Sequence, residues 1–414
     1  MKISNIPLYR FIGYTDAWEL RKLGEVADFS IKNNSLSRDK LTTDFYDVQN
    51  IHYGDILIKF NDVLDVSKTV LPSIIDSNVL DFKDALLLEG DIVFADAAED
   101  TTVGKAVEIR NLNGKDVVSG LHTIVARPKN SFAPFYIGYF INSPAYHNQI
   151  LPLMQGTKVS SISKSNLQST YLSYPSNDEQ SAIGTFFSTL DQHITLHQRK
   201  LDTLKEQKKT YLKLLFPAKG QTKPAYRFQG YTDAWELRKL GDEVYFYNGR
   251  AYKQSELLDF GKYKVVRVGN FNTNEKWYYS NLELEDSKTI DTGDLIYLWA
   301  TSFGPEIWKG SKSIYHYHIW KLIIQQVEKI DKNYLYMWLY QDKKKIAQNT
   351  NGSTMVHITK KMIESRDFMF PTLPEQSAIG TFFQILDQEI SQVEDKLASL
   401  KEMKKTLLRK LFVS

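Results

Sequence analysis

The chain has 414 residues, of which 42% are apolar and 13% aromatic, enough to bury a sizeable core in more than one domain. Its 52 lysines and arginines oppose 49 aspartates and glutamates, so the net charge of +3 excludes a strongly basic chain and leaves any nucleic-acid contact to local patches. The absence of cysteine excludes disulfides, thiolate zinc sites and cysteine nucleophiles, and suits a reducing compartment.

The amino-terminal stretch MKISNIPLYRFIGYTDAWEL lacks the apolar core of a signal peptide. No run of roughly 18 consecutive apolar residues occurs in the sequence. We therefore expect a cytoplasmic protein without membrane contact.

Two strings are duplicated along the chain. Tyr14 to Gly24 reads YTDAWELRKLG, and the same residues recur from Tyr231, an offset of 231 − 14 = 217. EQSAIGTFF begins at Glu179 and again at Glu375, an offset of 375 − 179 = 196. These periods are far longer than the roughly 20 to 50 residues of solenoid repeats, so each copy is predicted to be a domain followed by an appendage.

Short β-like runs separated by turns fill the interior of each predicted domain. They are GDILIKF from Gly54, EGDIVFAD from Glu89, VVSGLHTIVARP from Val117, KYKVVRVGNF from Lys262 and TGDLIYLWA from Thr292. Helical stretches accompany them, PFYIGYFINSPAYHNQI from Pro134 and YLYMWLY from Tyr334. The predicted fold class is α+β.

A segment rich in glycine and hydroxyl side chains precedes each appendage. The two segments are QGTKVSSISK from Gln155 and NGSTMVHITK from Asn351, and each is followed by a proline, Pro175 and Pro371. Both appendages are predicted to be long helices, because apolar residues recur at alternating steps of four and three, the seam of a coiled coil. The seam positions are Ile183, Phe187, Leu190, Ile194, His197, Leu201, Leu204, Lys208, Tyr211 and Leu215, then Ile379, Phe383, Leu386, Ile390, Val393, Leu397, Leu400, Lys404, Leu407 and Leu411.

The two helices either pair with each other or are buried separately on two domains. A 3.5-residue period over nearly five heptads favours pairing. The linker PAKGQTKPAY, residues 217–226, is too short to run back along the first helix, so a second helix that packs along the first must be antiparallel to it. We expect an antiparallel intramolecular coiled coil of about 58 Å with pseudo-twofold symmetry, holding two globular domains apart. Lys208 and Lys404 are either register markers or lysines that extend to solvent.

The doubled order of these motifs resembles the specificity subunit of type I restriction-modification systems. The resemblance rests on the Trp-Glu-Leu starts, the Gly-Asp strands, SGLHTIVARP, the Gly-Thr/Ser segments and the EQ-plus-coiled-coil blocks, and it covers essentially the whole chain. The corresponding division is target recognition domain 1 at residues 1–177, a first spacer helix at 178–217, target recognition domain 2 at 218–372, and a second spacer helix at 373–414.

The resemblance implies a chain that is not itself an enzyme. Each target recognition domain would read one half of a bipartite, asymmetric site in double-stranded DNA, and the helices would set the spacing and bind two modification (methyltransferase) subunits. S-adenosylmethionine would belong to those subunits, and ATP with Mg to restriction (motor-nuclease) subunits, so no cofactor is expected in this chain. Independently, two divergent readers on a duplicated frame predict a non-palindromic site, and longer helices should lengthen the unread spacer.

Several catalytic motifs are incomplete. Asn142 to Tyr146 reads NSPAY and lacks the consecutive prolines of the Asn-Pro-Pro-Tyr motif of adenine methyltransferases. Lys105 and Lys115 each follow a glycine but precede Ala and Asp, so neither completes a phosphate-binding loop. His316 and His318 alternate on a predicted strand and make a poor metal pair, so no metal site is expected. The alternative to a directing subunit is a standalone architectural or scaffold protein that binds DNA and dimerises through the coiled coil.

Base reading requires side chains that present donors and acceptors to base edges, with basic groups for the phosphates. We expect them on loops, with glycines allowing close approach of the backbone to phosphate. Each polar candidate has a second interpretation as a turn or cap residue. The candidates are Lys105, His122, Gln155, Gly156, Thr157, Lys158, Ser160 and Ser161 in the first domain, and Arg250, Arg267, Asn270, Thr301, Ser302, Asn351, Gly352, Ser353 and Thr354 in the second.

Aromatic residues that are identical in both halves cannot supply different sequence preferences. They belong either to the core or to a surface for the modification subunits, and of each adjacent phenylalanine pair one member suits the seam while the other faces elsewhere. The candidates for this partner interface are Tyr14, Trp18, Phe186, Phe187, Tyr231, Trp235, Phe382 and Phe383.

Overall fold

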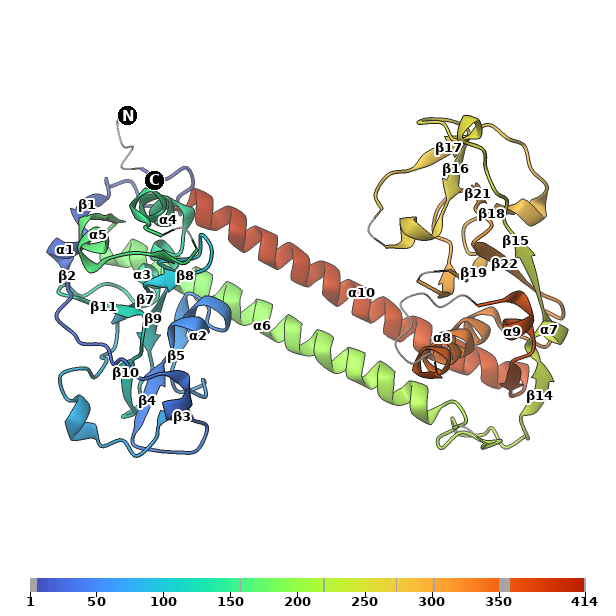
Figure 1. The fold of residues 1–414 in the computed structure, drawn as a ribbon, viewed down its shortest axis with the longest axis horizontal. Helices are drawn as coiled ribbons and strands as arrows, with labels where there is room; N and C mark the ends of the chain where they lie inside the picture. The colour runs from blue at the N-terminus through green and yellow to red at the C-terminus, as the bar shows by residue number, and fades with distance from the viewer. Residues whose placement is uncertain are drawn as a thin grey trace. The chain divides into compact units, whose positions relative to one another are not determined.

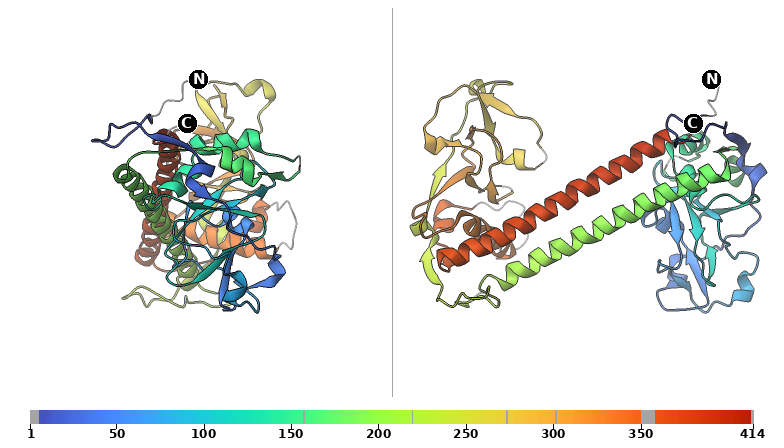
Figure 2. Two further views of the ribbon diagram at one scale, coloured as in Figure 1. Left: turned by 90° about the vertical axis from the view of Figure 1, so that its left-hand side faces the viewer. Right: turned by 180° about the vertical axis from the view of Figure 1, so that it is seen from behind.

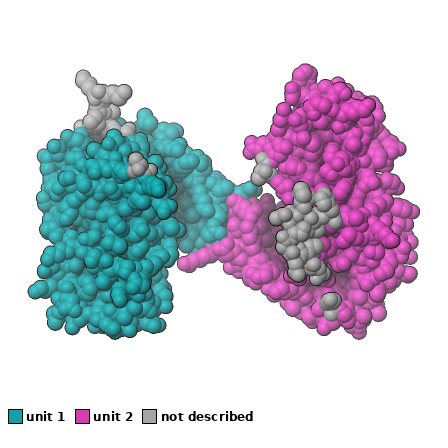
Figure 3. Space-filling model, in the orientation of Figure 1, with its two compact units in different colours: residues 1–198, 395–414 teal, residues 199–394 magenta. Residues whose placement is uncertain are grey.

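The structure is a computed structural model that describes residues 6–156, 158–218, 220–272, 274–300, 302–349 and 358–412. It divides into two compact units, residues 1–198 with 395–414, and residues 199–394 (Figure 3). Figure 1 labels two long helices, α6 (Asn177–Leu214) and α10 (Leu373–Lys410). Each helix contributes residues to both units. The mixture of helices and sheets confirms the α+β class.

The first unit contains two main sheets. Its strands are β1 Glu19–Lys22, β2 Ala27–Asp28, β3 Leu41–Thr42, β4 Val48–Ile51, β5 Val63–Asp65, β6 Ser73–Ile74, β7 Ile92–Ala95, β8 Ala97–Ala98, β9 Ala106–Arg110, β10 Asp116–Ser119, β11 Thr123–Pro128, β12 Ser160–Ser161 and β13 Tyr171–Tyr174. One sheet has the order β2-β11-β7-β9-β5 and the other β10-β4-β6-β3, while β1 pairs with β13 and β8 with β12. The short helices are α1 Leu23–Val26, α2 Tyr53–Ile58, α3 Tyr136–Ile141, α4 Pro144–Ile150 and α5 Lys164–Ser169.

Aromatic side chains form the core where the first unit packs on its long helices. Tyr136 and Phe140 of α3 join Phe187 of α6, Phe412 and Trp18 in one buried cluster. The hydroxyl of Tyr136 donates to the carbonyl oxygen of Ser173 at 2.8 Å, so the polar end of this buried ring is satisfied. The predicted strands from Glu89 and Val117 are present as β7, β10 and β11.

The prediction of a strand from Gly54 is wrong, because the run from Gly54 to Ile58 belongs to helix α2. His52 caps the helix, with its Nδ1 accepting from the Gly54 N–H at 3.1 Å, and Lys59 pairs with Asp55 one turn earlier at 2.8 Å. Of the apolar run, Ile56 is buried whereas Ile58 is 84% exposed. A short apolar run fits either structure, and here the cap and the ion pair favour the helix.

The second unit repeats this plan, and its described residues form fewer strands than those of the first. They are β14 Glu236–Lys239, β15 Val244–Asn248, β16 Tyr263–Val266, β17 Tyr278–Ser280, β18 Thr289–Ile290, β19 Leu295–Leu298, β20 Gly304–Ile307, β21 Ser313–Tyr315, β22 Ile319–Ile324 and β23 Asp367–Phe370. The sheets have the orders β15-β22-β19-β20 and β17-β16-β21-β18, and β14 pairs with β23. The short helices are α7 Leu240–Glu243 and α9 Lys360–Glu364, and α8 spans Lys332–Asn349.

Within each unit α6 and α10 lie side by side and antiparallel (Figure 2). In the first unit Lys404 of α10 pairs with Asp191 of α6 at 2.6 Å, and in the second Lys208 of α6 pairs with Asp387 of α10. The α10 partner thus falls from 404 to 387 as the α6 residue rises from 191 to 208. The predicted coiled coil is confirmed, with seam residues such as Leu201 only 6% exposed.

Both seam lysines are paired across the helices. The Lys404 ammonium also lies 2.7 Å from the Asp62 carboxylate, and its side chain is 15% exposed. The Lys208 side chain is 17% exposed. These contacts support the interpretation as register markers over extension to solvent. Among the described residues, no helix combines the length and the apolar character needed to cross a membrane.

Candidate nucleic-acid interface

Three loops converge at the end of β7 in the first unit. The Asp96 N–H donates to the His122 carbonyl at 3.0 Å, and the Asp96 carbonyl accepts from the Ile162 N–H at 2.8 Å. In the second unit the Trp299 N–H donates to the His318 carbonyl at 3.1 Å, and its carbonyl accepts from the Ile358 N–H at 3.2 Å. The backbone arrangement is therefore the same in both units.

We call these positions the corner surface. In the first unit it comprises residues 96–98, 120–122, 155–156 and 158–161, and in the second residues 299–300, 316–318 and 358. It joins the end of one central strand, the turn before its neighbour, and the segment that leads to α5 or α9. Loops at strand ends on a rigid sheet are common carriers of binding residues.

The glycine-rich segment of the first unit forms a tight turn. Gln155 and Ser161 exchange backbone hydrogen bonds of 3.0 and 2.8 Å, and β12 extends the turn by pairing with β8. Gly156 has φ +103°, and a Cβ there would lie 2.1 Å from the Val159 carbonyl oxygen, so only glycine fits. The Lys158 side chain is exposed. Gln155, Gly156, Lys158, Ser160 and Ser161 thus lie together, and Thr157 is outside the described residues.

His122 joins this turn through Asp96. Its Nδ1 lies 3.3 Å from the Asp96 carboxylate, and its side chain is 50% exposed. The backbone of His122 has φ +57°, and its ring contacts that of Tyr53 at 5.3 Å between centroids. His122 is therefore held in a fixed orientation while its ring still meets solvent.

Lys105 has a different environment. Its ammonium donates to the carbonyls of Leu57 and Phe60 at 3.1 and 2.9 Å, at the carboxyl end of α2. Burial lowers the pKa of Lys105. The ammonium therefore hydrogen-bonds the carbonyls at the carboxyl end of α2, a contact of the kind that stabilises helix C-termini.

Two arginines lie near the corner surface of the second unit. The Arg250 backbone bonds to Tyr315 and Tyr317, each at 3.1 Å, and its guanidinium pairs with Glu256 at 2.7 Å. The Arg267 guanidinium stacks over the Tyr278 ring at 4.3 Å. Both are thus built into the loops beside residues 316–318.

Asn270 has its side-chain amide committed to its own loop. Its Oδ1 accepts from the Arg267 N–H at 3.0 Å, and its Nδ2 donates to the carbonyls of Asn274 and Lys276 at 3.3 and 3.1 Å. This is the geometry of a turn residue. Ser302 is exposed, and Thr301, Asn351, Gly352, Ser353 and Thr354 lie outside the described residues.

Aromatic rings dominate the corner surface of the second unit. Trp299 lies 4.8 Å from His318 between ring centroids, and Tyr317 lies 4.0 Å from His318. Trp299 Nε1 donates to the Tyr317 carbonyl at 2.8 Å. Burial, with His318 and Arg267 nearby, lowers the pKa of His316 to about 4. The imidazole is therefore neutral near pH 7.

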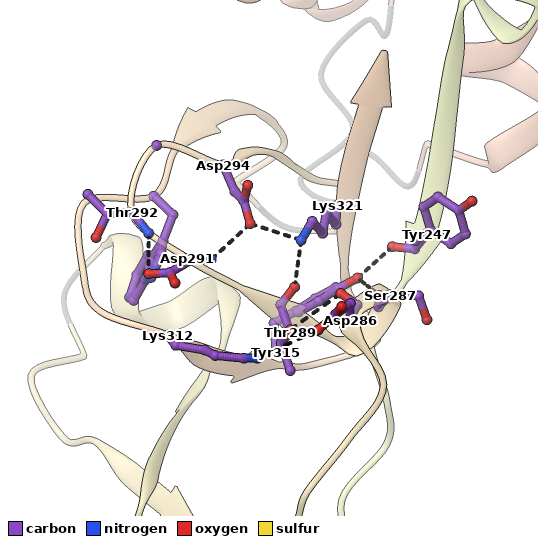
Figure 4. Close-up of polar contacts among 12 residues, drawn as sticks. Tyr247, Asp286, Ser287, Thr289, Asp291, Thr292, Asp294, Lys312, Tyr315 and Lys321 are labelled. Carbon is purple, nitrogen blue, oxygen red and sulfur yellow. Dashed lines mark hydrogen bonds and ion pairs between the residues drawn. The ribbon is translucent and has the colours of Figure 1, made fainter. Parts of the chain in front are cut away.

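Polar contacts hold the turn that carries this ring cluster. The hydroxyl of Tyr315 donates to the carbonyls of Tyr247 and Ser287 at 3.1 and 2.5 Å (Figure 4). The Lys321 ammonium lies 3.0 Å from both the Asp294 carboxylate and the Thr289 carbonyl, and Figure 4 marks both contacts with dashed lines. The strands on both sides of residues 316–318 are thereby fixed.

Asp96, Trp299 and Tyr317 were missed as candidates in the sequence. The signal that could have found the first two is the shared Gly-Asp before each strand, because both residues follow that aspartate by five positions. The described residues contain no group of three His, Asp or Glu side chains placed to hold a metal ion.

The partner interface proposed for the shared aromatic residues needs correction. Trp18, Phe187, Trp235 and Phe383 are buried within their own units, at 2%, 0%, 7% and 0% exposure, so their side chains belong to the core and offer no surface to a partner. The remaining four are half-buried on intramolecular neighbours. Phe186 packs on Phe11, Phe382 on Tyr211 and Phe228, and the hydroxyls of Tyr14 and Tyr231 donate to the carbonyls of Asp178 and Pro374.

The family described as type I restriction modification DNA specificity domain matches residues 15–206 and again residues 232–402. The chain belongs to this family. The two matches correspond to the two copies of the duplicated strings, so the specificity domain occurs twice in this chain.

One relative matches most of the chain, and another matches less than half of it. A putative type I restriction enzyme MjaX specificity subunit of Methanocaldococcus jannaschii is 24% identical over 427 aligned positions, covering 95% of this chain and 92% of that protein. The MjaVIII specificity subunit of the same organism is 26% identical over 183 positions, covering 43% of this chain and 42% of that protein.

Solved structures share the fold. The S subunit of a type I restriction-modification system from M. genitalium superposes with a TM-score of 0.61 at 16% identity, covering 99% of both chains. A chain from a structural study of complex assembly and conformational transition of the type I R-M system has a TM-score of 0.53 at 14% identity, covering 94% of this chain and 96% of that one.

Proposed function

We propose that this chain is the non-catalytic specificity subunit of a type I restriction-modification complex, and that its two units read the two halves of a bipartite, asymmetric site in double-stranded DNA. The corner surface carries the proposal. The same backbone bonds recur in both units, whereas the side chains differ, with Asp96 in one and Trp299 in the other. The same backbone arrangement with different side chains suits two units that recognise different bases.

The chemistry in this proposal belongs to partner subunits. Two modification subunits bring S-adenosylmethionine for methylation, and restriction subunits bring ATP and Mg for cleavage, in the cytoplasm where the DNA lies. Two copies of one partner need two copies of one docking surface, and the strings duplicated at Tyr14 and Tyr231 supply repeated sequence on both units.

A standalone scaffold that dimerises through its helices is the weaker alternative. The seams of α6 and α10 are already paired within one chain, with Leu201 and Leu397 at 6% and 5% exposure. A second copy would have to break these contacts before forming the same ones between chains. The intramolecular pair therefore favours a monomeric chain that recruits different subunits.

Reconstitution of methyl transfer tests the proposal. The purified chain with DNA and labelled S-adenosylmethionine should transfer no methyl groups, and adding the modification subunit encoded with it should give sequence-specific transfer. Methyl transfer by the chain alone would contradict the non-catalytic role. A stable homodimer that ignores the modification subunit would instead support the scaffold.

A further inference from the structure

The residues that directly follow β7 and β19, Asp96 and Trp299, have the same backbone hydrogen bonds but different side chains. The backbone N–H and carbonyl of Asp96 are hydrogen-bonded to two loops of the first unit. Those of Trp299 are hydrogen-bonded to the two corresponding loops of the second unit. The strands below them are in matching register, with Ala95 opposite Thr123 and Leu298 opposite Ile319. The two side chains therefore leave the sheet from the same position.

Asp96 presents a partly used carboxylate. Its Oδ1 lies against His122 Nδ1 at 3.3 Å, while its Oδ2 has no hydrogen bond to any residue that the structure describes. The side chain is 25% exposed. Burial raises the pKa of Asp96, and the neighbouring His122 opposes that rise. An acceptor in this partly dry position gains from a donor brought by a ligand.

The chemistry of the two side chains leads to different base preferences. A carboxylate accepts from the exocyclic amino groups that cytosine and adenine present in the major groove, and it is repelled by the acceptors of guanine and thymine. The indole of Trp299 has no such acceptor. The ring contacts of Trp299 with His318 suit apolar or stacking contact instead.

We propose that Asp96 is a base-reading residue of the first unit and accepts a hydrogen bond from the exocyclic amino group of a cytosine or adenine in the first half-site. This inference rests on the proposed function. His122 acts as a positioning residue, because its ring fixes Oδ1 and leaves Oδ2 directed to the ligand.

Selection of bound DNA from a random duplex library tests this role in the full chain assembled with its modification subunit. Asp96→Asn exchanges an acceptor oxygen for a donor at nearly constant volume. It should lower the preference for one base pair of the first half-site by about tenfold or more, and leave the second half-site unchanged. Asp96→Glu keeps the carboxylate and should keep the requirement for an amino group at that base pair.

Asp100→Asn is the matched control. Asp100 lies in the turn after β8, where it is exposed and its carboxylate accepts from the N–H and hydroxyl of Thr102 at 2.8 and 2.5 Å. This variant should select the wild-type site. Selection that is retained at the other base pairs of the first half-site reports in the same experiment that the first unit of the Asp96 variants is folded, and the unchanged second half-site reports that the complex is assembled.

Two outcomes separate the inference from the function on which it rests. If Asp96→Asn selects the wild-type base at each position of the first half-site within about twofold, or if Asp96→Glu loses selection as Asp96→Asn does, the base-reading role is overturned while the specificity function stands. If the wild-type complex selects no bipartite site, the proposed function itself fails.

Discussion

Arg10 donates from Nε and Nη2 to the two carboxylate oxygens of Glu179, each at 2.7 Å. Arg227 bonds Glu375 in the same way in the second unit, and both glutamates are 1% exposed. The glutamates open the duplicated EQSAIGTFF strings near the start of each long helix. Each arginine lies four residues before the duplicated YTDAWELRKLG string, so one buried ion pair ties the start of each half to its helix.

Replacing Arg10 by alanine should destabilise the first unit by about 3–5 kcal/mol, because Glu179 would remain buried without its partner. The exposed pair of Arg21 and Glu19, at 56% and 61% exposure, supplies the control, since Arg21→Ala should cost less than about 1 kcal/mol. Hydrogen exchange of the first unit measures both changes. Equal effects of the two variants would show that Arg10 does not hold this junction.

The ion pair of Lys208 and Asp387 should set the register of the helix pair in the second unit. Lys208→Asp brings two carboxylates together and should lower the unfolding midpoint in urea. Adding Asp387→Lys should restore most of the loss, because the pair is re-formed with its charges exchanged. The exposed pair of Lys200 and Glu389, at 54% and 42% exposure, should respond weakly to the same exchange. A double variant no more stable than Lys208→Asp would count against this role.

The second unit should lose stability in mild acid because of His316. Its pKa is lowered to about 4 in the folded chain by burial, His318 and Arg267, whereas the ordinary value is 6.5. Between these values the unfolded chain binds more protons than the folded one, so stability present above pH 6.5 falls as the pH drops toward 4. His316→Gln should reduce the difference between urea midpoints at about pH 7.5 and about pH 5. His122→Gln, in the first unit, should leave that difference as it is in the wild type.

Gly156→Ala should disturb the turn of the corner surface without unfolding its unit. The added Cβ would meet the Val159 carbonyl oxygen, so the backbone at Gly156 or Val159 must move, and affinity for the specific site should fall about tenfold, or 1.4 kcal/mol. Gly114→Ala is the control, because Gly114 also has a positive φ of +77° but nothing within 4 Å of the new Cβ. If the two variants bind labelled DNA equally in a titration, this turn does not contribute to recognition of the site.

The features predicted best from the sequence depend on repetition or long periodicity. The seam from Ile183 to Leu215 was visible because one helix repeats the same requirement many times. The GDILIKF run was too short for its period to decide, and the cap that makes it a helix is a side-chain contact of His52. The pairs of Arg10 and Arg227 with their glutamates had a signal, since both partners recur at the offsets of the two duplicated strings.

The corner surface was predicted in part. The hydroxyl-rich segment from Gln155 pointed to a loop, but its contact with Asp96 depends on β12 pairing with β8, residues far apart in the sequence. Composition also could not show that Lys105 is engaged by carbonyls of α2, because an exposed and a buried lysine look alike in a sequence. The sequence did not distinguish a core position from a surface position for shared aromatic residues such as Trp18. The structure shows that Trp18 is buried in the core of its unit.

Exchange of one reader tests most directly whether each unit reads its own half of the site. Residues 24–175 would be replaced by the corresponding residues of another member of the family, and the chain expressed with its modification subunit in a host whose methylated bases are then sequenced. One half of the methylated motif should change, while the other half and the spacer length stay the same. A change in both halves, or in neither, would contradict the division of reading between the two units.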